Sequence, residues 1–184
     1  MADNINSIIP LVALWGEELV GLELGVASGD SLIAIIRQCP NIKTMHAVDS
    51  WRPYTDYLKA VGDGKPACKV SETHAKNNKL LTYDKIKHSG LSHKIVVHEK
   101  DTKVALKSFP KESLDFIWMD AYLTYKQAVG ELKDWYPKLK KGGLFTGHDW
   151  HCDDIRKAVL EFRSKNNVKG NLVILPETWS WRKS

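Results

Sequence analysis

The segment from Val20 to Trp51 limits the fold of this chain more than any other stretch. It begins with an apolar run, continues through a turn bracketed by Gly25 and Gly29, and then carries apolar residues at helical spacing. A second apolar run ends in Asp49, at roughly the 20-residue distance from the turn expected for a ribose-binding acid. The order of strand, glycine turn, helix and strand predicts one half of a nucleoside-binding fold.

The rest of the chain continues the alternation of strands and helices. Further strands are predicted over residues 94–98, 114–119, 144–146, 172–175 and 179–181, and helices over 70–89, 104–106, 125–139 and 155–162. Alternating elements imply a parallel sheet with right-handed crossovers, and the last two strands, joined by a short turn, imply an antiparallel edge. The predicted fold class is α/β: a doubly wound, mostly parallel, seven-stranded sheet with an antiparallel C-terminal edge strand.

The chain of 184 residues has the length of one domain with its own core, so residues 1–184 are predicted to form a single domain. Residues 52–69 break the pattern with prolines, glycines and aromatic residues, and they predict a lid or insertion because long loops in compact domains are usually functional or disordered. No apolar run approaches the roughly 20 residues of a membrane span, and the N-terminal stretch lacks the basic start of a signal peptide.

Cysteine usage and charge narrow the location and the partners. Cys39, Cys68 and Cys152 show no paired spacing and fit reduced thiols, so we expect a cytoplasmic protein. The net charge of +5 comes from lysines spread along the chain, without the aromatic residues that accompany basic runs in RNA-binding surfaces. We therefore expect a small-molecule or glycan partner rather than nucleic acid, and no membrane partner; a homodimer is left open.

Four predicted strands are each followed by an acid. Asp49, Asp101, Asp120 and Asp149 all lie at or just beyond the carboxyl ends of these strands. In doubly wound sheets, ligands bind outside the carboxyl ends of the strands. We therefore expect these side chains to converge on one functional site.

The glycine turn is flanked by acids, with Glu23 before Gly25 and Asp30 directly after Gly29. A pyrophosphate needs a helix N-terminus without competing negative charge, so a dinucleotide fits this turn poorly. A P-loop is excluded because no Gly-Lys-Ser/Thr follows. A ligand that carries an ammonium and a sulfonium group would instead be attracted by the two carboxylates.

Three motifs extend this pattern over nearly the whole chain: ELGVASGDS, HAVDSW and DFIWMDAYLTYKQAVGELKDWYPKLKKGGLFTGHDW. Together they resemble the class I S-adenosylmethionine-dependent methyltransferases, in particular the small branch with a GVxxGxS turn and a GGLxxGHDW strand. The third motif, with a strand ending in Asp and a later strand ending in His-Asp, is highly characteristic of that family. The resemblance implies a Rossmann-like methyltransferase fold and S-adenosylmethionine as the cofactor.

The resemblance also implies roles for individual positions. Glu23 and Gly25 would hold the methionine end of the cofactor, and Gly29 would give it room to approach the backbone. Asp49 would accept hydrogen bonds from the ribose, and Asp101 would contact the adenine amino group. The predicted cofactor-binding residues are Glu23, Gly25, Ser28, Gly29, Ser31, Asp49, Ser50, Trp51, Asp101, Thr102 and Asp120.

Methyl transfer to a hydroxyl requires that the acceptor lose a proton, with the help of a base or of a divalent metal. The predicted catalytic residues are Asp120, His148 and Asp149, which are also acceptable ligands for Mg²⁺ or another divalent cation. Related metal-dependent O-methyltransferases carry acidic or amide ligands at these two strand ends. Many relatives have a histidine where this chain has Leu123, so any role there is lost. Three interpretations stay open: a metal site, a metal-free base at His148, and a cap by His148 and Asp149 on a helix that begins near Asp153.

His151 and Cys152 follow His148 and suggest a soft-metal cluster, although their spacing matches no standard zinc motif. The expected function is S-adenosylmethionine-dependent O-methylation of a sugar or small hydroxylated molecule, with the acceptor pocket shaped by residues 52–69 and by the segment after Asp149. The alternatives are a non-catalytic S-adenosylmethionine-binding module, or an aminopropyltransferase or NAD-dependent oxidoreductase on the same fold.

Overall fold

The structure, a computed structural model, describes residues 7–53, 70–121, 124–175 and 177–184, and its main feature is a seven-stranded sheet with the order β3-β2-β1-β4-β5-β7-β6. The strands are β1 (Leu19–Leu24), β2 (Ile42–Asp49), β3 (Ile95–Glu99), β4 (Leu114–Met119), β5 (Leu139–Gly147), β6 (Val173–Leu175) and β7 (Thr178–Arg182). Strands β1 to β5 pair in parallel, whereas β7 is antiparallel to both β5 and β6. The predicted mostly parallel sheet with antiparallel C-terminal strands is confirmed, and β6 forms its outer edge.

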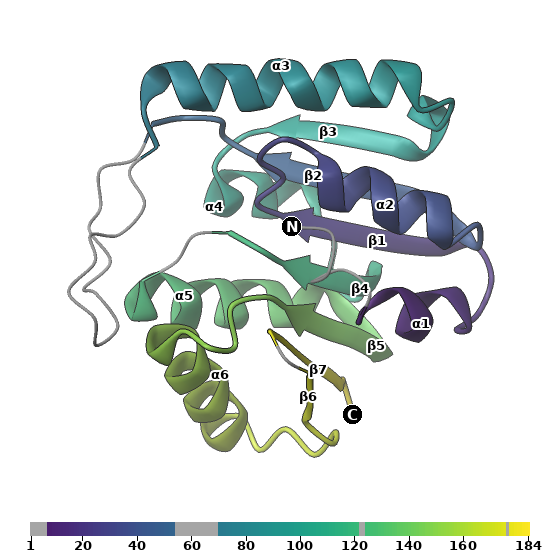
Figure 1. The fold of residues 1–184 in the computed structure, drawn as a ribbon. Coiled ribbons are helices and arrows are strands. Elements are labelled where there is room, and N and C mark those ends of the chain that lie inside the picture. The colour runs from purple at the N-terminus through teal and green to yellow at the C-terminus, as the bar shows by residue number, and fades with distance from the viewer. Residues whose placement is uncertain (1–6, 54–69, 122–123, 176) are drawn as a thin grey trace.

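Helices cover both faces of the sheet, as Figure 1 shows. They are α1 (Ile9–Ala13), α2 (Asp30–Gln38), α3 (Glu72–His88), α4 (Thr102–Ala105), α5 (Tyr125–Trp135) and α6 (Asp153–Lys165), with 3-10 turns at η1 (Ser92–Lys94), η2 (Leu106–Ser108) and η3 (Tyr136–Lys138). Buried residues of α1, α2 and α3 form one core cluster, and those of α4, α5 and α6 form the other. This doubly wound arrangement leaves the carboxyl edge of the sheet for the loops that carry the predicted site residues.

Strand β1 lies inside the sheet, between β2 and β4. Leu22 and Leu24 are fully buried on the face covered by α4, α5 and α6. Because side chains alternate along a strand, Glu23 points to the opposite face, where α2 packs. The strand order changes direction between β1 and β4, which is the point where doubly wound sheets bind their ligands.

The largest differences from the predicted element boundaries are at the start of β5 and at the end of α5. Strand β5 begins at Leu139, before the predicted start, because Gly142, with a φ of 74°, forms part of an irregularity inside the strand instead of a turn that precedes it. Helix α5 ends at Trp135, and the 3-10 turn Tyr136–Lys138 replaces the last predicted helical turn. Pro137 accounts for this ending, since proline cannot continue the hydrogen-bond ladder of a helix.

Helix α1 was not predicted from the sequence. It is one short turn with Pro10 near its start, and Val12 is its fully buried anchor in the core. The guanidinium of Arg182 lies over the ring of Trp15, 4.3 Å from the ring centroid. The segment that follows α1 therefore packs beside β7. A short element of this kind has no periodicity for a sequence pattern to reveal.

The proposed lid lies mostly outside the described residues, because only Arg52 and Pro53 of residues 52–69 are described.

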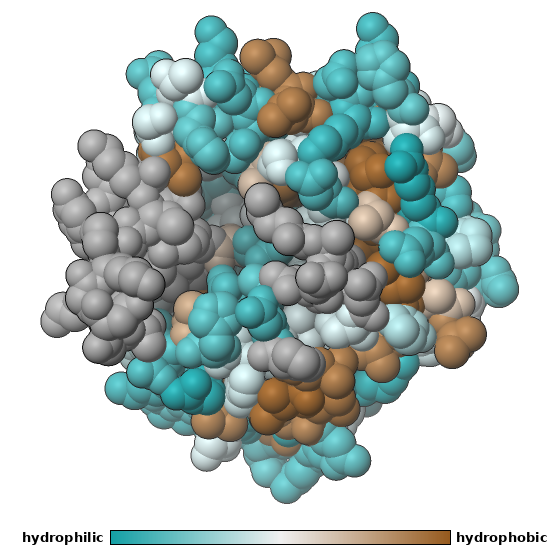
Figure 2. Space-filling model, viewed as in Figure 1, coloured by the Kyte–Doolittle hydropathy of each residue, from teal (hydrophilic) through white to brown (hydrophobic). Residues whose placement is uncertain are grey.

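Figure 2 shows hydrophilic side chains over most of α3 at the top of the view. None of the helices in the described ranges is both long and apolar enough to cross a lipid bilayer.

Gly25 offers a test of how tightly the loops after β1 and β4 are fitted together. It has a φ of 84°, and a Cβ atom there would lie 2.6 Å from Ala121 Cα and 2.7 Å from the Asp120 carbonyl oxygen. We expect Gly25→Ala to lower the unfolding free energy by about 1–3 kcal/mol, since it adds left-handed strain to a backbone clash. Urea unfolding measures the effect.

Gly130→Ala is the matched control, because Gly130 lies within α5 and a Cβ atom there would have no described neighbour within 4 Å. There the substitution should raise the unfolding free energy by roughly 0.4–1 kcal/mol, since alanine favours helix. Equal stability of the Gly25→Ala protein and the unsubstituted protein would contradict the close approach of the two loops.

Candidate active site

Glu23 is the most deeply placed charged residue of the site. It is fully buried in β1, and its Oε1 accepts a hydrogen bond from the Ser31 hydroxyl in the first turn of α2. Its Oε2 has no hydrogen-bond partner among the described residues. Burial raises the pKa of Glu23 well above its ordinary value; the Ser31 hydrogen bond opposes this, and the charges of Asp120 and Asp49 add to it. A buried carboxyl oxygen without a partner is costly, so this group is a candidate for binding a cationic or hydrogen-bond-donating ligand.

Asp49 organises the glycine turn. Its Oδ2 accepts hydrogen bonds from the backbone amides of Val26 and Ala27, both at 2.9 Å, and its Oδ1 accepts one from the Trp51 amide at 2.7 Å. A carboxylate has about four acceptor positions, so capacity for a further donor remains. The acid predicted for the ribose therefore also holds the turn in shape.

Helix α3 packs against the same turn and forms a hydrogen bond with it. The Ala27 carbonyl accepts from the Thr82 hydroxyl at 2.7 Å and from the Trp51 indole at 2.8 Å. Gly29, with a φ of 77°, packs against Thr82, where a Cβ would approach its side chain to 3.2 Å. The position that a side chain at Gly29 would occupy is therefore taken by α3, and the cofactor contact that the resemblance implies for Gly29 stays a prediction.

The serines of the turn and the acid after it bind protein groups. Ser28 donates its hydroxyl to Asp30, and Lys85 of α3 contacts both the Ser28 carbonyl and the Asp30 carboxylate at 2.9 Å and 2.6 Å. The Lys85 and Ser28 hydrogen bonds lower the pKa of Asp30. Beyond the turn, Ser50 accepts a weak hydrogen bond from the Arg52 amide at 3.4 Å. The negative charge beside Gly29 is therefore partly compensated by α3.

The segment after β3 contacts a buried acid of α5 that the sequence prediction missed. Asp101 caps α4 through a hydrogen bond from the Lys103 amide at 2.9 Å, and the neighbouring Thr102 donates its hydroxyl to Glu131 of α5. Glu131 is 6% exposed, and burial raises its pKa. Its position in α5 looked like that of an exposed helix residue, because glutamate is rarely buried.

The acids that follow β4 and β5 meet around one histidine. Nδ1 of His148 lies 3.2 Å from Asp120 Oδ1 and 3.0 Å from Asp149 Oδ1. The side chains of both acids are 27% exposed, and that of His148 is 15% exposed. One ligand atom from each of these three residues lies within 4.8 Å of the others, so the predicted catalytic set is brought together and its geometry can accommodate a metal ion.

The two neighbouring acids raise the pKa of His148. Burial opposes the charged imidazolium, but hydrogen bonds and charges from Asp120 and Asp149 outweigh it and raise the pKa of His148 to about 10. Burial likewise raises the pKa of Asp120, against the hydrogen bond and charge of His148. At neutral pH the metal-free cluster therefore holds a proton on the imidazole.

Glu177 completes the surroundings of His148 and was not predicted as a site residue. Its Oε2 lies 3.3 Å from His148 Nε2, and its backbone carbonyl accepts from the Trp150 amide at 3.1 Å. The antiparallel pairing of Gly147 with Trp179 places the turn before β7 beside the end of β5. This contact depends on the pairing of β7 with β5, whereas the sequence predicted the antiparallel edge without the contact of its turn with His148.

The helix-capping interpretation of His148 and Asp149 does not describe this structure. Helix α6 begins at Asp153 with Cys152 as its N-cap, and no side-chain hydrogen bond from the described residues caps it. Leu123, at the position where many relatives have histidine, lies outside the described residues.

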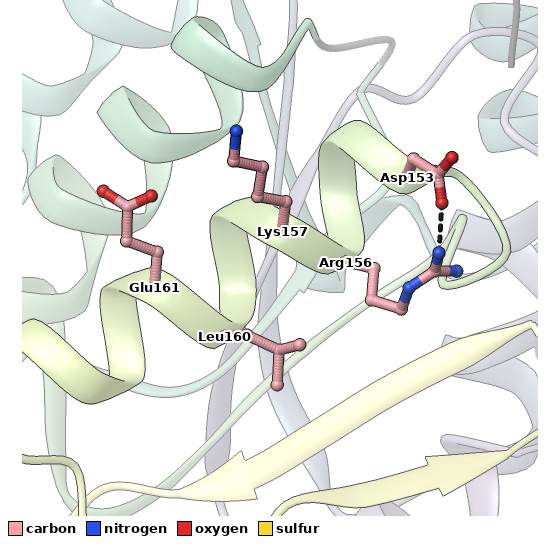
Figure 3. A pocket seen from close by; sticks show the side chains of 5 residues that line it. All are labelled: Asp153, Arg156, Lys157, Leu160 and Glu161. Atoms are coloured by element: carbon pink, nitrogen blue, oxygen red, sulfur yellow. Dashed lines mark hydrogen bonds and ion pairs between the residues drawn. The ribbon is translucent and has the colours of Figure 1, made fainter.

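Figure 3 shows a separate hollow along one face of α6. It has a volume of about 450 Å³ and is lined by Asp153, Arg156, Lys157, Leu160 and Glu161. Arg156 pairs with Asp153, the Lys157 ammonium lies 4.8 Å from the Tyr125 ring, and Glu161 accepts from the Tyr125 hydroxyl. The charged groups are already partnered and include none of the strand-end acids, so we assign this hollow no function.

The fold and the site define a class of protein: a doubly wound sheet with carboxylates at the carboxyl ends of its strands and no P-loop. Residues 22–150 match the family described as "Methyltransferase domain". The chain belongs to this family, and the predicted S-adenosylmethionine-dependent methyltransferase of class I is confirmed. No significant match is found among curated protein sequences.

Solved structures share the fold over almost the whole chain. The O-methyltransferase NovP is 19% identical with a TM-score of 0.62, covering 98% of this chain and 76% of that one. The precorrin-6y C5,15-methyltransferase from Geobacter metallireducens is 11% identical with a TM-score of 0.66, covering 97% and 87%. A SAM-dependent O-methyltransferase from Thermotoga maritima is 13% identical with a TM-score of 0.62, covering 97% and 64%.

Glu23→Gln tests whether the buried carboxyl is kept at a cost to stability. Because the folded-state pKa of Glu23 is raised, its contribution to stability is present at low pH and is lost as the pH rises above the ordinary value of 4.5. We expect the variant to be more stable than the unsubstituted protein at pH 7 by roughly 1–3 kcal/mol, measured by urea unfolding without cofactor. Glu72→Gln, at an exposed position, is the control and should change the unfolding free energy little. A Glu23→Gln protein that is less stable than the unsubstituted protein at pH 7 would contradict the raised pKa of Glu23.

Proposed function

We propose that this methyltransferase transfers a methyl group from S-adenosylmethionine to a hydroxyl group of a sugar or another small hydroxylated molecule. The observation that carries the proposal is the pairing of two groups at the switch point of the sheet: the unpartnered Glu23 carboxyl oxygen and the cluster around His148. The first suits the cationic end of the cofactor, and the second suits removal of a hydroxyl proton.

The donor set fits the cofactor chemically. Glu23 would bind its ammonium, and Gly25, with no side chain, lets the loop after β4 that carries Asp120 approach the turn closely. Asp49 has acceptor capacity left for the ribose hydroxyls. When bound, S-adenosylmethionine supplies a methyl group activated by its sulfonium. The residues named here bind and align it, since such displacements depend mainly on proximity and orientation.

His148 and its acids support a metal-assisted reaction more than a metal-free base. With a pKa of about 10, His148 is protonated at neutral pH and cannot accept another proton. A divalent cation held by Asp120, Asp149 and the neutral imidazole would replace that proton and lower the pKa of a bound acceptor hydroxyl. Asp120 and Asp149 would be its oxygen ligands, whose chemistry suits Mg²⁺ or Mn²⁺.

The choice of a hydroxyl acceptor rests on two kinds of support. A cluster of two acids and an imidazole that can hold a divalent cation suits activation of a hydroxyl group. Several proteins with the same fold are described as O-methyltransferases. A small acceptor is favoured over nucleic acid because lysines are scattered along the chain. The cytoplasmic location, the single domain, the lid and the homodimer stay predictions.

The alternatives differ in what they require of the glycine turn. Lys85 compensates Asp30, so the case against a pyrophosphate, and hence against NAD, now depends mainly on Glu23. A non-catalytic module would keep the turn and Asp49 but would have no need for the convergence of Asp120, His148 and Asp149.

Transfer of labelled methyl groups tests the proposal. We expect the protein to bind S-adenosylmethionine but not NAD in calorimetry, and to methylate at least one member of a panel of sugars, catechols and phenols in the presence of Mg²⁺. Asp120→Asn should lower kcat by about 10²-fold or more, because it removes a proton-handling or metal-binding group.

The control is Asp134→Asn, which makes the same charge change at a partly exposed position of α5 outside the cluster. Absence of cofactor binding at millimolar concentration would overturn the proposed function. Unchanged turnover in Asp120→Asn would overturn the role of the cluster.

A further inference from the structure

A second group of metal-ligating side chains lies beside the proposed catalytic cluster. Asp149, His151 and Cys152 each offer one ligand atom, and these atoms lie within 4.8 Å of one another. Their spacing along the chain matches no standard zinc motif. The structure nevertheless brings them together through the local path of the backbone.

A tight turn explains the convergence. The Cys152 amide donates to the Asp149 carbonyl at 2.9 Å, which closes a turn from Asp149 to Cys152 and brings its first and last side chains together. Asp149 has a φ of 61°, a left-handed conformation that is uncommon outside glycine and costs free energy. The Trp150 amide, held by the Glu177 carbonyl at 3.1 Å, fixes the same turn from the other side.

The donor atoms differ in kind from those around Asp120. A thiolate, an imidazole and one carboxylate are the ligands that Zn²⁺ and similar cations prefer, whereas Mg²⁺ prefers oxygen alone. Three protein ligands leave a fourth tetrahedral position for water. His151 is exposed and Cys152 is half-buried, so a cation can reach them from solvent.

Asp149 is shared by the two groups. Its Oδ1 lies 3.0 Å from His148 Nδ1, and the rings of His148 and His151 are 6.3 Å apart. A cation bound by Asp149, His151 and Cys152 would therefore change the charge directly beside His148.

We propose that Asp149, His151 and Cys152 form a binding site for one zinc-class divalent cation, next to the Asp120 cluster and joined to it through Asp149. On binding, the thiol of Cys152 releases its proton to solvent, and the thiolate, imidazole and carboxylate coordinate the cation. This site does not depend on the methyl-transfer reaction, so it can be tested on the protein without cofactor.

Titration with Co²⁺, a spectroscopic substitute for Zn²⁺, tests the site. We expect one equivalent of Co²⁺ to produce the near-ultraviolet charge-transfer absorption of a cobalt–thiolate bond, and Zn²⁺ to displace it. Cys152→Ser should abolish this absorption, and His151→Asn should weaken cation binding at least about tenfold, as loss of even an outer partner of a metal typically does.

Two controls separate this site from its neighbours. Asp120→Asn removes a ligand of the other cluster only, and Cys68→Ser removes a thiol outside the described residues; both should keep the absorption. Circular dichroism checks that each variant is folded, and His151→Asn alters an exposed position, so it tests the proposal even if Cys152→Ser fails to fold.

Each remaining outcome overturns the proposal. Absence of the cobalt–thiolate absorption in the unsubstituted protein means that no such site forms. Its persistence in Cys152→Ser places the thiolate elsewhere. Loss of binding in Asp120→Asn together with unchanged binding in His151→Asn places the cation in the Asp120 cluster.

Discussion

Burial of the Glu23 carboxyl inside the sheet is the constraint on which the site depends. A parallel sheet covered on both faces buries its inner strands, so the side chain of a glutamate in β1 loses its hydration. Ser31 satisfies one oxygen and leaves the other without a partner among the described residues. The fold tolerates this cost at the switch point between β1 and β4, where a ligand cation would relieve it. The same crowding requires Gly25, since the loop after β4 passes against it.

Parallel topology gathers the remaining chemistry at one edge. Asp49 ends β2, Asp120 follows β4, and His148 with Asp149 follows β5, so all lie at the carboxyl edge of the sheet. The side chains of Asp120, His148 and Asp149 meet there. Their roles differ because their partners differ. Asp49 is held by backbone amides and shapes the turn, whereas Asp120 and Asp149 face an imidazole and stabilise its proton.

The sequence predicted the sheet and the meeting of Asp120, His148 and Asp149, because strand periodicity and strand ends are local signals that parallel topology converts into proximity. The family was predicted from the resemblance of the three motifs. It could not predict contacts that depend on how distant elements return. Glu177 reaches His148 only because β7 runs antiparallel to β5, and Thr82 fills the space at Gly29 only because α3 packs there. The start of β5 was placed too late because a diglycine resembles a turn even when it lies inside a strand.

The most direct measurement is the number of protons released when S-adenosylmethionine binds, obtained by calorimetry in buffers of different ionisation enthalpy. Burial leaves Glu23 protonated above its ordinary pKa range, and the cofactor's ammonium would favour the carboxylate. As the pH rises above the ordinary glutamate value of 4.5, binding should therefore release a proton in the unsubstituted protein and none from this position in Glu23→Gln. An identical proton release in both proteins, or no release in either, would contradict the account of Glu23 as the buried group that receives the cofactor.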